Sequence, residues 1–159
     1  MDKGRLIERV TSLPKENRIA LRRSFGKALD DASFRALTSL YMLYDAETKE
    51  DDEIHFFVLT LVCYYGDYAE NGIAFKDALS KYYYTDISDS EKKRIMHLMD
   101  KPRKKRGMFY KELASIIKKI ARENIFIDAT DLSEALKKWN WNSRVVQKSV
   151  AEAIAKAMK

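Results

Sequence analysis

Lysine and arginine side chains, which can bind phosphate groups, are concentrated in one stretch of this 159-residue sequence. Residues 91–122 contain 12 basic and 3 acidic side chains, whereas residues 45–90 contain 3 basic and 11 acidic ones. Neutralising phosphates and releasing their counterions supplies most of the sequence-independent affinity for nucleic acid. The basic stretch therefore predicts a surface that faces phosphates, with a solvated basic helix face that binds nothing as the alternative.

Individual cations in this stretch and near the N-terminus are the candidate phosphate contacts. Arginine suits this role because its planar guanidinium can bind two phosphate oxygens, whereas lysine acts as a mobile point charge. The segment 101–106, KPRKKR, is interpreted as a flexible connection that follows an irregular single strand, or alternatively as a solvated loop. The predicted nucleic-acid-binding residues are Arg22, Arg23, Lys27, Arg94, Arg103, Lys104, Lys105, Arg106, Lys111, Lys118, Lys119 and Arg122.

No residue pattern in the sequence predicts catalysis or a cofactor. The two histidines, His55 and His97, stand far apart, and no cluster of cysteine and histidine offers ligands for zinc. There is also no glycine-rich loop for nucleotide phosphates and no nucleophile elbow. The acidic run Glu47–Glu53 leaves a magnesium-dependent nuclease as one interpretation, since carboxylate oxygens suit this ion, but a solvated acidic loop is preferred. We expect a protein that is not an enzyme and holds no metal or cofactor.

Two tryptophans are candidates for stacking on nucleobases, as aromatic platforms do. Trp139 continues the helical stripe of Leu132 and Leu136, so it is expected in the core. Trp141 is outside that stripe, and the pattern leaves its role open.

The composition favours a helical protein with its own core. The sequence is 46% hydrophobic and 34% charged, with only 5 Gly and 2 Pro, too few chain breakers for a sandwich or a barrel. Cys63 is the single cysteine and cannot form an intrachain disulfide. The N-terminus lacks an apolar stretch of signal-peptide length, and the longest aliphatic run, Ile54–Gly66, is too short to span a membrane. We therefore expect a cytoplasmic protein with no membrane contact.

Apolar stripes and capping residues predict an all-α fold of about eight helices. The predicted caps are Ser33, Ser88 or Ser90, Asp128 or Thr130, and Asn142 or Ser143. Residues 54–65 would also suit a strand, because they are rich in β-branched and aromatic side chains. Pro102 disfavours helix at the residue before it and is expected to separate two small helical-bundle lobes, residues 1–100 and 101–159. The predicted helices cover approximately residues 15–27, 33–44, 54–65, 73–84, 88–99, 109–120, 128–139 and 142–158.

Four groups of residues, in this order along the chain, resemble a known family. They are Ala20–Arg23 (ALRR), Gly72 followed by Ser90–Ile95 (SEKKRI), the basic-faced helix Phe109–Ile120, and Ile127-Asp128 followed by Leu132, Leu136 and Trp139. From about Arg18 to the C-terminus the chain resembles the small subunit of the type I-E CRISPR Cascade surveillance complex, the CasB family. The chain departs from the family pattern at Phe75, at Ala129 and at Val150-Ala151.

The resemblance implies an all-helical, two-lobed subunit without catalytic activity, which takes part in antiviral defence. Such a subunit clamps the duplex of guide RNA and target DNA, together with the displaced strand, through phosphate contacts that do not read sequence. Arg22, Arg23 and Arg94 match basic positions of the family. Lys111, Lys118, Lys119 and Arg122 match only as members of a basic face. The implied partners are the other Cascade subunits, the guide RNA, the target DNA and a second copy of the chain.

The separation of charge along the chain also supports a different interpretation. An acidic region followed by a basic one would suit a helical protein–protein adaptor that self-associates or docks through complementary faces. This adaptor is the alternative to the nucleic-acid-binding subunit.

Overall fold

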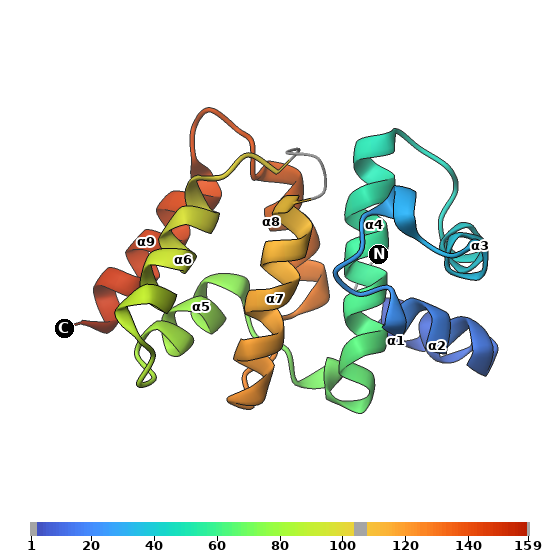
Figure 1. Cartoon of the computed structure of the whole chain (residues 1–159), viewed down its shortest axis with the longest axis horizontal. Helices are drawn as coiled ribbons and strands as arrows, with labels where there is room; N and C mark the ends of the chain where they lie inside the picture. The colour runs from blue at the N-terminus through green and yellow to red at the C-terminus, as the bar shows by residue number, and fades with distance from the viewer. Residues whose placement is uncertain (1–2, 104–107, 159) are drawn as a thin grey trace.

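The computed structural model describes residues 3–103 and 108–158, and over these residues it is built from α-helices (Figure 1). This confirms the predicted all-α fold. The described residues form nine α-helices, against about eight predicted, and the first of them, α1, buries Leu6 and Val10. No helix in these two ranges is long and apolar enough to cross a membrane. The helices are α1 (Lys3–Thr11), α2 (Lys15–Arg23), α3 (Phe34–Leu43), α4 (Lys49–Tyr65), α5 (Phe75–Tyr83), α6 (Asp89–Asp100), α7 (Met108–Arg122), α8 (Ala129–Lys138) and α9 (Val145–Ala157), with short 3-10 helices η1 (Leu29–Asp31) and η2 (Gly66–Asn71).

Capping side chains start several of these helices at the predicted places. The hydroxyl groups of Ser33 and Ser88 accept backbone hydrogen bonds from the first turns of α3 and α6, at 3.2 Å and 3.1 Å. The carboxylate of Asp128 accepts two such bonds at the start of α8. The cap predicted at residue 142 or 143 is wrong, because Arg144 precedes α9 and makes no side-chain capping bond.

Helix α4 begins earlier than the sequence predicts. Thr48 caps it, and its first turn starts at Lys49, so most of the run Glu47–Glu53 is helical and the expected acidic loop is wrong. The physical reason is that carboxylates in a first turn are stabilised by the positive end of the helix dipole. Asp52 is also buried, where it accepts hydrogen bonds from the Tyr41 hydroxyl at 2.8 Å and from the backbone N–H of Glu47 at 3.2 Å.

Helix α4 is the centre of the fold. It contacts α1, α2 and α3 on one side and α8 on the other, and its apolar residues from Ile54 to Val62 are almost all buried (Figure 1). The strand that these residues would also suit is therefore excluded. Helix α5 packs along α9, and α6 packs against α7, so helices before and after residue 100 contact each other. The division into lobes 1–100 and 101–159 stays a prediction.

A close backbone contact joins the segment before α5 to the segment before α8. The backbone N–H of Ile73 donates to the Phe126 carbonyl at 2.8 Å, and the N–H of Asp128 donates to the Ile73 carbonyl at 2.7 Å. A Cβ atom on Gly72 would lie 2.6 Å from the backbone of Asp128. Only glycine therefore fits at position 72, because no real Cβ approaches a backbone atom so closely.

Candidate nucleic-acid interface

The residues that directly follow α2 pack against α7 and bring two groups of cations together. The Lys118 ammonium on α7 lies 5.5 Å from the ring centroid of Phe25 and 5.7 Å from that of Tyr64. Gly26, which has a positive φ of 96°, turns the chain so closely against α7 that a Cβ there would lie 3.3 Å from the Ala114 Cβ. Residues about 90 positions apart in the sequence are thus in contact.

We name this region the α2–α7 basic surface and define it by six of the predicted cations. On α7 they occur at i, i+7 and i+11, a spacing that places them along one face of a helix. Lys118 is half-buried and the others are exposed. Within residues 3–103 and 108–158, no carboxylate forms an ion pair with any of them. The six are Arg22, Arg23, Lys27, Lys111, Lys118 and Arg122.

Two hollows border α2 and add cations that are not among the predicted nucleic-acid-binding residues. A hollow of about 580 Å³ between α1, α2 and α4 is lined by Lys15, Arg18 and Arg22, and the buried Nε of Arg18 has no hydrogen-bond partner in the described part of the chain. A second hollow, of about 570 Å³, is lined by Arg23, Lys27 and Arg35. The helical spacing of Arg18 and Arg22 could have indicated the first group. No sequence signal places Arg35, because the turn between α2 and α3 brings it there.

Arg94 and Lys119 are held by a carboxylate beside this surface. The Lys119 ammonium lies 2.9 Å from Glu91, while the Arg94 guanidinium donates to the Ser115 hydroxyl at 2.9 Å and lies 4.0 Å from Glu91. The Tyr82 hydroxyl also donates to Glu91, at 3.3 Å, and burial together with this carboxylate raises the pKa of Tyr82. The charges of Arg94 and Lys119 are therefore partly compensated within the protein.

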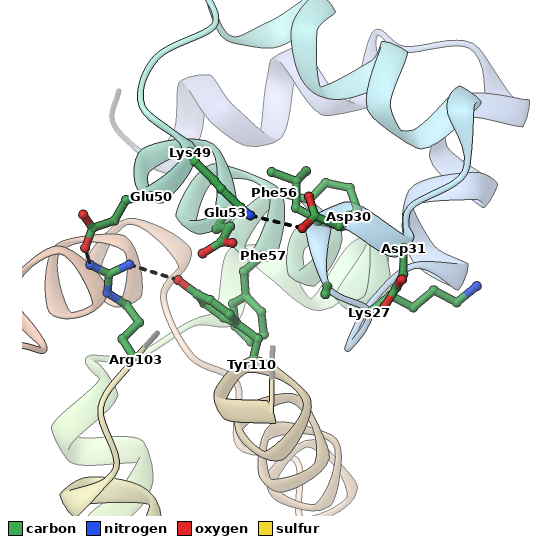
Figure 2. Close-up of a pocket in the computed structure, with 12 residues that line it drawn as sticks. Lys27, Asp30, Asp31, Lys49, Glu50, Glu53, Phe56, Phe57, Arg103 and Tyr110 are labelled. Atoms are coloured by element: carbon green, nitrogen blue, oxygen red, sulfur yellow. Dashed lines mark hydrogen bonds and ion pairs between the residues drawn. The ribbon is translucent and has the colours of Figure 1, made fainter. Parts of the chain in front are cut away.

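Arg103 is buried and belongs to a different environment (Figure 2). Its side chain is 3% exposed, and its guanidinium forms an ion pair with Glu50 and donates to the Tyr110 hydroxyl at 3.4 Å. Its backbone N–H donates to the Asn140 side chain at 2.9 Å. Burial also raises the pKa of Tyr110 to about 12. The structure thus corrects the expectation for Arg103, whose guanidinium is used inside the protein and is not exposed; Lys104, Lys105 and Arg106 lie outside the described residues.

The hollow beside Arg103 combines acidic and basic groups over an aromatic floor. It measures about 580 Å³ and lies between the residues after α2, the first turns of α4, and α7. The floor is formed by Phe56, Phe57 and Tyr110, and Lys49 on its edge pairs with Asp30 at 3.2 Å (Figure 2). Lys27, after α2, and Tyr110, in the first turn of α7, both line this hollow.

The remaining candidate residues have identifiable structural contacts. Trp139 is 2% exposed and its indole N–H donates to the Lys101 carbonyl at 2.9 Å, which confirms its place in the core. Trp141 is 51% exposed, and the Lys138 ammonium lies 5.7 Å from its ring centroid. His55 stacks on Tyr44 at a centroid distance of 4.2 Å, and burial lowers its pKa. The described residues contain no group of three His, Cys, Asp or Glu side chains placed to hold a metal ion.

The chain is similar to known proteins in its three-dimensional structure. No family model matches the chain, and no curated protein matches its sequence. A CRISPR-associated protein of the Cse2 family from Thermus thermophilus superimposes with a TM-score of 0.75 and 22% sequence identity. A structure of CasB, also from Thermus thermophilus, superimposes with a TM-score of 0.73 and the same 22% identity. Each match covers 98% of this chain and 99% of the other, so the chain has the fold of these Cse2 and CasB proteins over almost its whole length, in agreement with the resemblance seen in the sequence.

Proposed function

We propose that the chain is the small, non-catalytic subunit of a CRISPR RNA-guided surveillance complex of the Cascade type. The observation that carries this proposal is the superposition on a Cse2 protein and on CasB across 98% of the chain. Two of the residue groups that resemble the family also meet in space, because Gly72 contacts the backbone of Ile127 and Asp128. Two of the sequence groups that carry the resemblance therefore take part in one backbone contact of this chain.

The proposed activity is to hold nucleic acid by its phosphates through the α2–α7 basic surface. Exposed arginines without carboxylate partners among the described residues keep their hydrogen-bond donors available for phosphate oxygens. Such contacts fix the position of a strand or duplex and carry no sequence information. In RNA-guided complexes the sequence is read by base pairing with the guide, so a subunit of this kind needs no base-specific side chains.

The proposed partners are the guide RNA, the target DNA with its displaced strand, the other Cascade subunits and a second copy of the chain, all in the cytoplasm. A surface of six cations binds modestly by itself, and neighbouring subunits raise its effective concentration at the nucleic acid. Arg94 and Lys119 contribute if a phosphate replaces their contacts with Glu91.

The assembly is tested by co-expressing the affinity-tagged chain with a guide RNA and the other subunits of a Cascade-type complex. We expect the purified material to contain those subunits and the guide RNA in constant proportion to the tagged chain. A tagged chain that elutes alone, although the other subunits assemble with the guide RNA, would contradict the proposal. The variant Gly72→Ala, whose added Cβ overlaps the Asp128 backbone, serves as the control for a chain that is folded but destabilised.

A further inference from the structure

An aromatic series crosses from the end of α2 to the residues after α7, beside the basic surface. Phe25 stacks on Tyr64 at a centroid distance of 4.9 Å, and the next residue, Tyr65, meets Phe126 edge-on at 5.2 Å. Phe126 then stacks on Tyr68 at 5.0 Å, with only 3° between the two ring planes. A hydrogen bond holds one ring of the series in place, because the Tyr65 hydroxyl accepts from the backbone N–H of Ile127 at 3.0 Å.

Tyr68 ends this series as an exposed ring with a fixed orientation. Tyr68 is 56% exposed, while Tyr65 is buried and Phe126 is half-buried. One face of the Tyr68 ring lies on Phe126, which leaves the opposite face as the exposed one. A nucleobase stacks on such a preoriented aromatic face whatever its identity, because every base has a π-face.

Other exposed aromatic residues lack this combination. The Tyr41 hydroxyl donates a hydrogen bond to Asp52, and the Tyr84 hydroxyl donates one to the Ile154 carbonyl on α9. Trp141 has the Lys138 ammonium near its ring, and Phe34, although 85% exposed, stacks on no ring of the described residues. Tyr68 is thus held parallel to a supporting ring, and it belongs to the aromatic series that Lys118 contacts at Tyr64.

The charges around Tyr68 indicate how a strand would lie. Lys118 approaches the same aromatic series at Tyr64, and Arg122 follows Lys118 by one turn of α7, on the same face of that helix. Asp67 beside Tyr68 is exposed and repels a phosphate. The phosphates are therefore favoured on α7, and the Tyr68 ring is left to contact a base.

We propose that Tyr68 is a stacking platform for one nucleobase of a single strand whose phosphates lie on the α2–α7 basic surface. This inference rests on the proposed nucleic-acid-binding function and adds that the bound nucleic acid is single-stranded. A paired base inside a duplex has both faces covered by its neighbours, so the contact requires an unpaired base.

Binding of two fluorescently labelled oligonucleotides of equal length tests the proposal by anisotropy. One is single-stranded DNA with bases, and the other is a single strand of abasic sites with the same number of phosphates. The variant Tyr68→Leu removes the ring, Tyr68→Phe keeps it, and Phe34→Leu is the control at another exposed aromatic residue. Circular dichroism and thermal unfolding establish that each variant is folded.

We expect Tyr68→Leu to weaken binding of the strand with bases by about tenfold, in line with the usual contribution of base–aromatic stacking. Tyr68→Phe and Phe34→Leu retain wild-type affinity, and all four proteins bind the abasic strand equally. Wild-type affinity of Tyr68→Leu for the strand with bases, or an equal loss on both strands, would overturn the stacking proposal alone. Failure of the wild type to bind either strand, even at low salt, would overturn the proposed phosphate binding together with it.

Discussion

The ammonium group of Lys118 lies 5.5 Å from the ring centroid of Phe25 and so connects α7 with the end of α2. A contact of this kind contributes about 0.5–1 kcal/mol at a partly exposed site. Its larger consequence is geometric, because it joins α7 to the residues that directly follow Arg22 and Arg23. The basic surface therefore depends on the tertiary fold and does not exist in either helix alone.

Replacing the buried Arg103 by alanine should destabilise the protein without changing its binding to phosphates. The substitution leaves Glu50 without its guanidinium partner and removes a hydrogen bond to Tyr110, and we expect the free energy of unfolding to fall by about 2–4 kcal/mol. The exposed Arg23→Ala is the matched control, with a change in stability within about 0.5 kcal/mol. Urea unfolding measures both values. Equal stability of the two variants would show that the Arg103 contacts contribute nothing.

Substitution of Gly72 by alanine should disrupt the contact between the segments before α5 and α8. The added Cβ would lie 2.6 Å from the Asp128 backbone, so either the chain shifts or the hydrogen bonds between Ile73 and its partners break. We expect a loss of about 1–3 kcal/mol in unfolding free energy and faster amide hydrogen exchange at Ile73 and Asp128. Unchanged exchange at both amides would contradict the close approach.

The half-buried thiol of Cys63 should make the protein less stable in alkali. Burial raises the pKa of this thiol from 9.0 to about 12, although Arg18 and Arg22 partly oppose the shift. In the unfolded chain the thiol ionises near its ordinary pKa, so its stabilising contribution is complete below pH 9 and is lost as the pH rises from 9 towards 12. Urea unfolding at successive pH values should show a smaller alkaline loss for Cys63→Ala than for the wild type. Parallel curves would show that Cys63 is not buried as a neutral thiol.

Much of the fold could be predicted from the sequence because its signals act within one or two helical turns. Ser33 and Ser88 cap the turns that follow them directly, and the stripe of Trp139 repeats every three or four residues. The start of α4 could not be predicted in this way. Asp52 is stabilised there by the Tyr41 hydroxyl, which comes from another helix and has no local pattern.

The candidate site was predictable as a set of exposed cations but not as a surface. The polar faces of α2 and α7 identify Arg22, Arg23 and Lys118, whereas the contact between the two helices depends on Phe25 and on side chains about 90 residues away. Arg103 shows the opposite case. Its position in a basic run suggested exposure, and its burial follows from pairing with Glu50, 53 residues earlier.

The most direct test of the central claim is the salt dependence of binding to single-stranded DNA. The wild type is compared with the triple variant Arg22→Ala, Arg23→Ala and Arg122→Ala, and with a control that loses the three exposed lysines Lys76, Lys81 and Lys148 on α5 and α9. Each phosphate contact on a single strand contributes about 0.7 to the slope of log affinity against log salt. The arginine variant should therefore lose about 2 from the slope, while the control keeps the wild-type value. Equal slopes for all three proteins, or an equal loss in both variants, would contradict phosphate binding by the α2–α7 basic surface.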